Sequence, residues 1–169
     1  MKRDTSLKTL SWEHHDGLVL TFRIERGLKY NRDPQLIRTY LLHAWDTDLS
    51  HHFWQEEQVL PAALEKSEEG AALLAEMVRD HKWFAGLVEQ LRSRNRGWEE
   101  DLRQFAERLN AHIRFEEREL FPFLEHHAGR NELNRIGGFL QKQHRTKNEC
   151  WEPAFWRSDP DDTGLHPTD

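Results

Sequence analysis

The sequence lacks the features that define several classes of protein. Its only cysteine is Cys150, which excludes an intramolecular disulfide framework and a thiolate-rich metal site. No apolar run reaches the roughly 18 residues of a transmembrane helix, and the N-terminal stretch is not followed by the apolar core of a signal peptide. There is no basic block of the kind that binds nucleic acid, and the net charge is −6 with neutral histidine. We therefore expect a cytoplasmic protein that binds neither membranes nor nucleic acid.

The composition instead favours one domain built from amphipathic helices. Of the 169 residues, 32% are charged and only 37% are hydrophobic, which suits helices with wide solvated faces better than a sheet. The chain also contains eleven histidines and seven tryptophans. A histidine content this high calls for a physical explanation.

Apolar residues recur at helical spacing in four long segments. Asp33-Pro34 and Ser67 are typical helix N-caps, and Pro61 is expected to kink or end the second helix. Short links favour antiparallel neighbours. The sequence therefore predicts an all-α fold, an antiparallel up-down-up-down four-helix bundle over residues 8–128, with helices at about 11–28, 34–66, 67–93 and 98–121.

The C-terminal part of the chain has a different character. A short extra helix is predicted at about 131–149, interrupted by Gly137-Gly138, so that residues 129–150 add one helix packed on the bundle. Residues 151–169 are rich in Pro, Asp, Ser and Thr. We expect this tail to be flexible.

Polar residues occupy the middle of each long apolar stripe, where leucine would be expected. Because mid-helix positions of an antiparallel bundle lie at one depth, these side chains are predicted to converge. On the first helix, His15 shares a face with Leu18 and Phe22, whereas the alternative, His14, shares one with Leu10 and Leu18; His15 is preferred. The candidate metal ligands are His15, His52, Glu56, His81, His112 and Glu116.

The pattern His-x-x-x-Glu occurs twice, as His52 to Glu56 and as His112 to Glu116. Residues four apart lie one helical turn apart on one face, with Cβ atoms about 5–6 Å apart, so both can bind the same ion or two neighbouring ions. Two carboxylates in an apolar core repel each other and lose their hydration, and two divalent cations remove both problems. Nitrogen and oxygen ligands without thiolate suit iron, manganese or zinc.

Each of these residues also has an ordinary interpretation. A single histidine is more often a satisfied core or surface residue than a ligand, and only the joint pattern favours a metal site. Glu57 and Glu117 point about 100° away from the proposed ligands, which favours a role outside the coordination sphere or in solvent. Asp48, one turn before His52, either orients that ring or is solvated.

The set of six residues resembles the hemerythrin HHE cation-binding domain over about residues 8–128. The two proline-terminated His-x-x-x-Glu helices are the most specific part of the resemblance. The resemblance implies a non-haem di-iron centre in which the two glutamates bridge the irons and the histidines complete the coordination. Members of this family bind O₂, sense oxygen, nitric oxide or iron, or repair iron centres.

Two departures from the oxygen-carrying hemerythrins bear on function. Those proteins have a His-x-x-x-His pair on the third helix, whereas His81 has Met77 four residues before it and Ala85 four after. Their fourth helix ends its motif with a more distant Asp, where this chain has Glu116. Fewer histidines leave more open metal positions, which favours sensing, oxidant chemistry or iron handling over oxygen carriage.

We therefore expect two iron ions, with manganese or zinc as alternatives, in a protein that binds or senses O₂, peroxide or nitric oxide. One alternative is an enzyme with the same site, either a di-iron oxidase or peroxidase or an iron-handling or repair protein. Another is a purely structural metal site. A sensor of this kind would act through a partner protein in trans, as a monomer or a homodimer.

Overall fold

The computed structural model describes residues 3–143 and 151–158. This part of the chain is almost entirely helical and contains no strand, which confirms the all-α prediction. None of its helices combines the length and the apolar character needed to cross a membrane. The elements are, in chain order, η1 (Thr5–Leu7), α1 (Lys8–Lys29), α2 (Pro34–Ala44), η2 (Trp45–Leu49), α3 (Ser50–Val59), α4 (Pro61–Leu64), α5 (Glu68–Ser93), α6 (Glu99–Phe115), η3 (Glu116–Leu120), α7 (Phe121–His127) and α8 (Arg130–Gln143).

The helix starts follow local sequence chemistry. The Asp33 side chain accepts the backbone N–H of Gln35 at 2.9 Å, and proline occupies the first position of α2. The Ser67 hydroxyl accepts the backbone N–H of Gly70 at 3.1 Å at the start of α5. The predicted second helix is one rod of four pieces, in which the π-helical turn η2 joins α2 to α3 and Pro61 begins α4.

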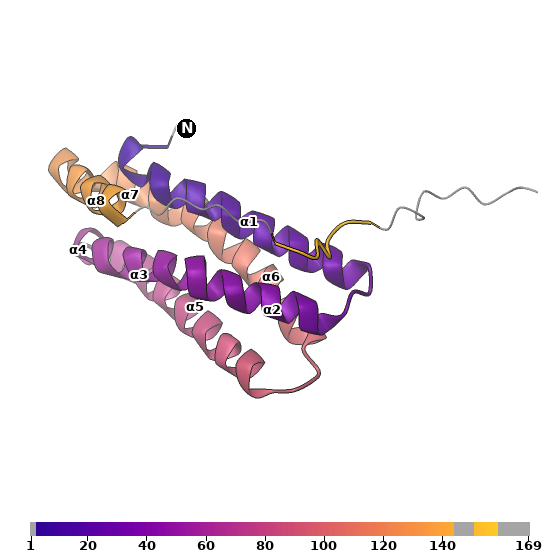
Figure 1. Cartoon of the computed structure of the whole chain (residues 1–169). Coiled ribbons are helices and arrows are strands. Elements are labelled where there is room, and N and C mark those ends of the chain that lie inside the picture. Colours follow the sequence, from indigo (N-terminus) through magenta and orange to yellow (C-terminus); the bar gives the residue numbers. More distant parts are fainter. Residues whose placement is uncertain (1–2, 144–150, 159–169) are drawn as a thin grey trace, which may run out of the picture.

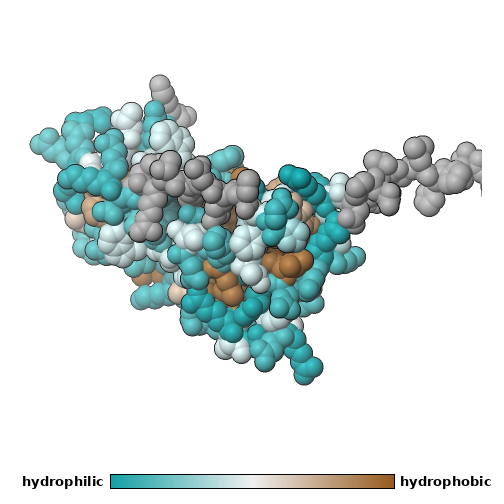
Figure 2. Space-filling view, viewed as in Figure 1, coloured by the Kyte–Doolittle hydropathy of each residue, from teal (hydrophilic) through white to brown (hydrophobic). Residues whose placement is uncertain are grey.

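The long helical segments run side by side along the molecule, with α8 and η1 together at one end (Figure 1). Hydrophilic residues cover most of the face shown in Figure 2, as the composition leads one to expect. The apolar core has two parts. One contains Ile24, Leu41, Phe84 and Phe105, and the other contains Leu7, Leu60, Met77 and Phe121.

Helix α8 differs from its prediction because Gly137-Gly138 lies inside it without interrupting it. A Cβ on Gly137 would lie 2.9 Å from the Cα of Ser6, so this glycine allows α8 to approach η1 closely. The absence of a side chain at that position reflects packing rather than a helix end. The rest of the expected helix, residues 144–149, and Cys150 lie outside the described residues.

Residues 151–158 differ from the flexible tail expected there, because they pack on the bundle. Phe155 is only 4% exposed and belongs to the apolar core beside Tyr40 and Ile37. The Arg32 guanidinium donates to the carbonyl oxygens of Phe155, at 3.1 Å, and Arg157, at 2.8 Å. Composition does not reveal this contact because three aromatic residues are sufficient to anchor an otherwise polar segment. Residues 159–169 lie outside the described residues.

Candidate metal centre

Six polar side chains from four helical segments meet between the two parts of the apolar core. Each is at most 6% exposed, and both glutamates are fully buried. Helix α1 contributes one histidine, α3 a histidine and a glutamate, α5 a histidine, and α6 with the first residue of η3 a histidine and a glutamate. The six are His14, His52, Glu56, His81, His112 and Glu116.

The six residues form two groups that share both glutamates. The first group adds His14 and His52, and the second adds His81 and His112; within each group the possible ligand atoms all lie within 4.8 Å of one another. Glu56 and Glu116 each face both groups. The arrangement thus has two equivalent positions, each facing two imidazoles and two carboxylates.

The distances show how each carboxylate is divided between the two positions. Glu56 Oε1 lies 3.3 Å from His52 Nε2, and its Oε2 lies 3.4 Å from His81 Nε2. Glu116 Oε2 lies 2.9 Å from His14 Nε2, and its Oε1 lies 3.3 Å from His112 Nε2. Each glutamate therefore directs one oxygen to the first position and the other oxygen to the second, as a bridging carboxylate does.

The inner atoms of the site are poorly satisfied by protein groups alone. Both oxygens of each glutamate and the Nε2 atoms of three histidines are buried and lack a well-aligned hydrogen-bond partner in the described chain. Buried polar atoms normally have partners, and a buried carboxylate without one is strongly destabilising. Cations at the two positions would satisfy both the carboxylate oxygens and the imidazole nitrogens, so the residues fit a pair of metal ions.

The pKa values show what balances the charge when protons take the place of metal. Burial by itself would lower the pKa of His81, but the carboxylates of Glu56 and Glu57 raise it to about 9. Burial would likewise raise the pKa of Glu56, yet the nearby imidazoles, His52 first among them, hold it well below its usual value near 4.5. Protons and metal ions therefore compete for the same imidazole nitrogens.

A second set of carboxylates holds the outer nitrogen of each histidine; we call Glu13, Glu57, Asp80 and Glu117 the outer carboxylates. Glu13 of α1 pairs with His52 Nδ1 of α3 at 2.8 Å. Glu57 of α3 pairs with His81 Nδ1 of α5, also at 2.8 Å. An outer partner of this kind fixes the ring and its tautomer, so that Nε2 points inward with its lone pair available.

The other two outer carboxylates pair with histidines in the same way, and the last pair returns to α1. Asp80 of α5 pairs with His112 Nδ1 of α6 at 3.2 Å, and Glu117 of η3 pairs with His14 Nδ1 of α1 at 2.8 Å. Burial would raise the pKa of both carboxyl groups, but hydrogen bonds from the histidines and from nearby arginines lower each to about 2. Every imidazole of the centre is thus oriented by a carboxylate from a different helical segment.

The comparisons with known proteins agree with this geometry. A family model described as the hemerythrin HHE cation binding domain matches residues 9–124. The chain belongs to this hemerythrin family. The searches of curated proteins and of solved structures gave no match. The match spans all six residues of the centre and all four outer carboxylates, and it ends within α7.

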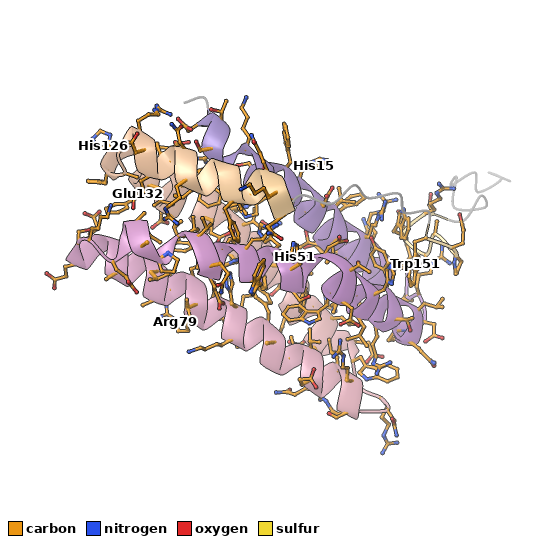
Figure 3. All side chains as sticks on the ribbon, turned by 60° about the vertical axis from the view of Figure 1, so that its left-hand side comes forward. His15, His51, Arg79, His126, Glu132 and Trp151 are labelled. Atoms are coloured by element: carbon orange, nitrogen blue, oxygen red, sulfur yellow. The ribbon has the colours of Figure 1, made fainter. Side chains whose placement is uncertain are left out.

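The first-helix position is where the hemerythrin-like centre departs from the sequence prediction. His15 is exposed on the outer side of α1 (Figure 3), whereas His14 is 3% exposed and faces the centre. The expectation that His15 joins the other residues is therefore wrong, because His14 occupies that position. The stripe used to choose it is the solvent face, because Trp12 is 63% exposed and Phe22 is 51% exposed.

Sequence reasoning also missed two outer carboxylates, Glu13 and Asp80, and assigned Asp48 as a possible partner of His52. Asp48 instead lies 3.2 Å from the Thr47 hydroxyl, and Glu13 occupies the position at His52. All four outer carboxylates are next in sequence to a core-facing residue of the centre. Such a neighbour lies about 100° around the helix, which directs it to the interface with the next helix. A carboxylate directly beside a candidate ligand in the sequence was therefore the signal that could have identified these two residues.

A π-helical turn follows the second His-x-x-x-Glu motif. Pro61 follows His52 by nine residues, but Pro122 follows His112 by ten. The π-helical turn η3 begins at Glu116, inside this longer interval, and a turn of this type accommodates one additional residue without ending the helix. The additional residue lies after Glu116, so the spacing of four between His and Glu is the same in both motifs.

Proposed function

We propose that the chain holds two iron ions in this centre and binds or senses a small molecule, O₂, peroxide or nitric oxide, at an open iron position. The observation that carries the proposal is the pair of equivalent positions, each facing two Nε2 atoms and one oxygen from each glutamate. Bound iron would supply redox chemistry and open coordination sites there. Two histidines together with carboxylate oxygens form a donor set that non-haem iron uses in proteins.

With iron in the two positions, the donor count leaves a reactive centre rather than a closed one. Four protein ligands complete a tetrahedral zinc site, but they leave room on an ion that takes five or six ligands. The apolar walls exclude bulk water, since Phe84 and Phe121 are fully buried beside the histidines. We also propose the antiparallel up-down-up-down topology, which brings the middle of each helical segment to one depth and is supported by short links at 30–33, 65–67 and 94–98.

Anaerobic loading with ferrous iron tests the proposal. We expect two irons per chain by metal analysis, and reversible changes in the absorption and paramagnetic resonance spectra when nitric oxide or air is admitted. The variants Glu56→Gln and Glu116→Gln should lose iron, while Glu89→Gln, an exposed carboxylate on α5, should not. A tightly held zinc ion with no spectral response to either gas would contradict the proposal and favour a structural site. Turnover of peroxide or nitric oxide with a reductant would assign an enzyme instead.

A further inference from the structure

Arg3 precedes α1 and lies outside the segment that the family model matches, yet it reaches the edge of the metal centre. Its guanidinium donates to Oε2 of Glu117 at 2.6 Å and to the backbone oxygen of the same residue at 2.8 Å. The other carboxylate oxygen of Glu117 holds Nδ1 of His14 at 2.8 Å and accepts the Ser11 hydroxyl at 2.6 Å. A single carboxylate group therefore separates Arg3 from a histidine of the centre.

Arg3 also contacts the aromatic ring that covers the imidazole of His14. Its guanidinium lies over Phe121, 5.1 Å from the ring centroid. Phe121 in turn stacks on His14, with ring centroids 5.3 Å apart and ring planes 5° apart. The imidazole is thus held by a carboxylate at Nδ1 and by a phenyl group on its face, and Arg3 contacts both. The carboxylate sets the direction of the ring, and the phenyl group sets its plane.

Further contacts fix Arg3 itself at this end of the bundle. Its Nη1 lies 3.1 Å from Oε1 of Glu125 on α7, and the same oxygen accepts the backbone N–H of Asp4 at 2.7 Å. The Nε of Arg3 is buried and has no hydrogen-bond partner in the described chain. Because a buried unpaired N–H costs free energy, the contacts of the two terminal nitrogens must outweigh that cost. A guanidinium held in this way has a defined geometry, unlike an exposed ion pair.

At each of the two proposed metal positions, one histidine has an outer carboxylate that is bound by an arginine. For His112 the carboxylate is Asp80, which accepts from Arg108 at 2.7 Å. Arg108 lies one turn before His112 on α6, so this support is contained within the helical segments that supply the centre. For His14 the support comes from the segment that precedes α1. The two metal positions therefore depend on different parts of the chain.

We propose that Arg3 is a positioning residue of the metal centre, which acts through Glu117 and Phe121 on His14 and thereby strengthens metal binding at the position formed by His14 and His52. The inference rests on the proposed metal centre and adds a role for the segment that precedes α1. Without Arg3, the partly exposed Glu117 can turn toward solvent, and the imidazole loses its fixed direction. Changing the outer partner of a metal-binding histidine alters affinity by about 10- to 100-fold. Arg3 lies one contact further out, so its effect belongs at the lower end of that range.

Titration of the full chain with cobalt(II), which is stable in air and gives a visible spectrum on binding, tests this role. Arg3→Ala should bind two ions, one of them about tenfold more weakly and the other as in the unaltered chain. The matched control is Arg118→Ala, which removes the same charge at an exposed position beside Glu117 in the sequence and should keep both affinities. Unchanged binding in Arg3→Ala would overturn the proposal, and so would tighter binding, which would mean that the charge of Arg3 opposes the metal. An unaltered chain that binds no metal would instead contradict the proposed centre itself.

A proton magnetic resonance spectrum of the cobalt-loaded chain separates positioning from a general loss of stability. Each metal-bound imidazole keeps one N–H, at Nδ1, whose signal is shifted by the paramagnetic ion and disappears in D₂O as the proton exchanges. We expect four such signals, one from each histidine of the centre, and Glu117→Gln identifies that of His14. In Arg3→Ala this signal alone should exchange faster, and Arg3→Lys, which keeps the charge without the fork, should restore part of the protection. Equally fast exchange of all four signals would show general loosening and would overturn a specific role for Arg3.

Discussion

Glu13 on α1 lies 2.8 Å from Nδ1 of His52 on α3, although its own neighbour in sequence, His14, faces the same centre. Each imidazole is therefore held by a carboxylate from another helix. We predict that Glu13→Gln weakens metal binding by about 10- to 100-fold while the centre still takes two ions, because the amide orients His52 without raising its basicity. Competition with a chelator measures the affinity. Glu25→Gln, an exposed change on the same helix, is the control, and equal affinities for the two variants would refute the prediction.

The adjacent residues His14 and His15 give a sharp test of the first-helix position. His14→Ala should reduce the metal content, since it removes one of two imidazoles from one position and leaves His81 and His112 at the other. His15→Ala should leave the metal content unchanged because this side chain is exposed. Metal analysis of the two purified variants decides the matter. Loss of metal from the His15 variant alone would mean that α1 is rotated from the orientation described.

Metal removal should lower thermal stability in a way that depends on the inner glutamates. A ligand that binds only the folded chain stabilises it by about 2.7 kcal/mol at 100 times its dissociation constant. We therefore expect the melting temperature to fall when metal is chelated. Glu56→Gln should show a much smaller difference between its loaded and chelated forms, because one bridging carboxylate is gone. Scanning calorimetry with and without chelator measures this, and an undiminished metal effect in the variant would contradict it.

The N-terminal turn provides a pH-dependent contribution far from the metal centre. The backbone N–H of Ser6 and the Arg130 guanidinium lower the pKa of Asp4 from its usual value near 3.8. A lowered pKa in the folded state means that the stabilisation is present above pH 3.8 and is lost as the pH falls through the folded value. Asp4→Asn should therefore lower the free energy of unfolding by about 1 kcal/mol at pH 7. Denaturant titrations should show the two proteins converging in acid; a constant difference down to pH 2 would refute this.

The C-terminal contact should contribute strongly to stability. Phe155 is 4% exposed, and a Cβ on Gly27 would lie 2.8 Å from its ring, so the phenyl group fills a tight site against α1. We predict that Phe155→Ala lowers the free energy of unfolding by about 3–5 kcal/mol. Arg157→Ala is the control, because it keeps the backbone contacts of Arg157, whose oxygen accepts from Arg32 and whose N–H donates to Ala154. Similar denaturation midpoints for the two variants would show that this segment does not contribute to the core.

The sequence was most informative where patterns repeat. Apolar spacing and the caps Asp33 and Ser67 predicted the helices, because those caps act within a few residues of the chain. The two His-x-x-x-Glu motifs led to four of the residues that meet in the centre. A local spacing rule can find such pairs because residues four apart share a helix face whatever the fold around them.

The sequence was least informative where the choice depends on distant contacts. His14 and His15 differ only in which face of α1 is buried, and the large apolar residues Trp12 and Phe22 lie on the exposed face. The buried face is set by small residues such as Gly17, where a Cβ would lie 2.9 Å from the Ile113 side chain. Hydrophobic periodicity gives little weight to glycine, so it selected the wrong stripe. The packing of Phe155 likewise depends on a partner more than a hundred residues away.

Residues on both sides of the family match complete the apolar core. Leu7 precedes the matched segment, Ile136 and Leu140 follow it, and all three are fully buried, as Phe155 nearly is. A fragment cut at residues 9 and 124 would keep every residue of the candidate metal centre and yet expose this apolar surface to water. The apolar core thus extends beyond the segment that carries the polar centre. A shortened version of this chain would need new polar residues wherever those flanking segments now pack.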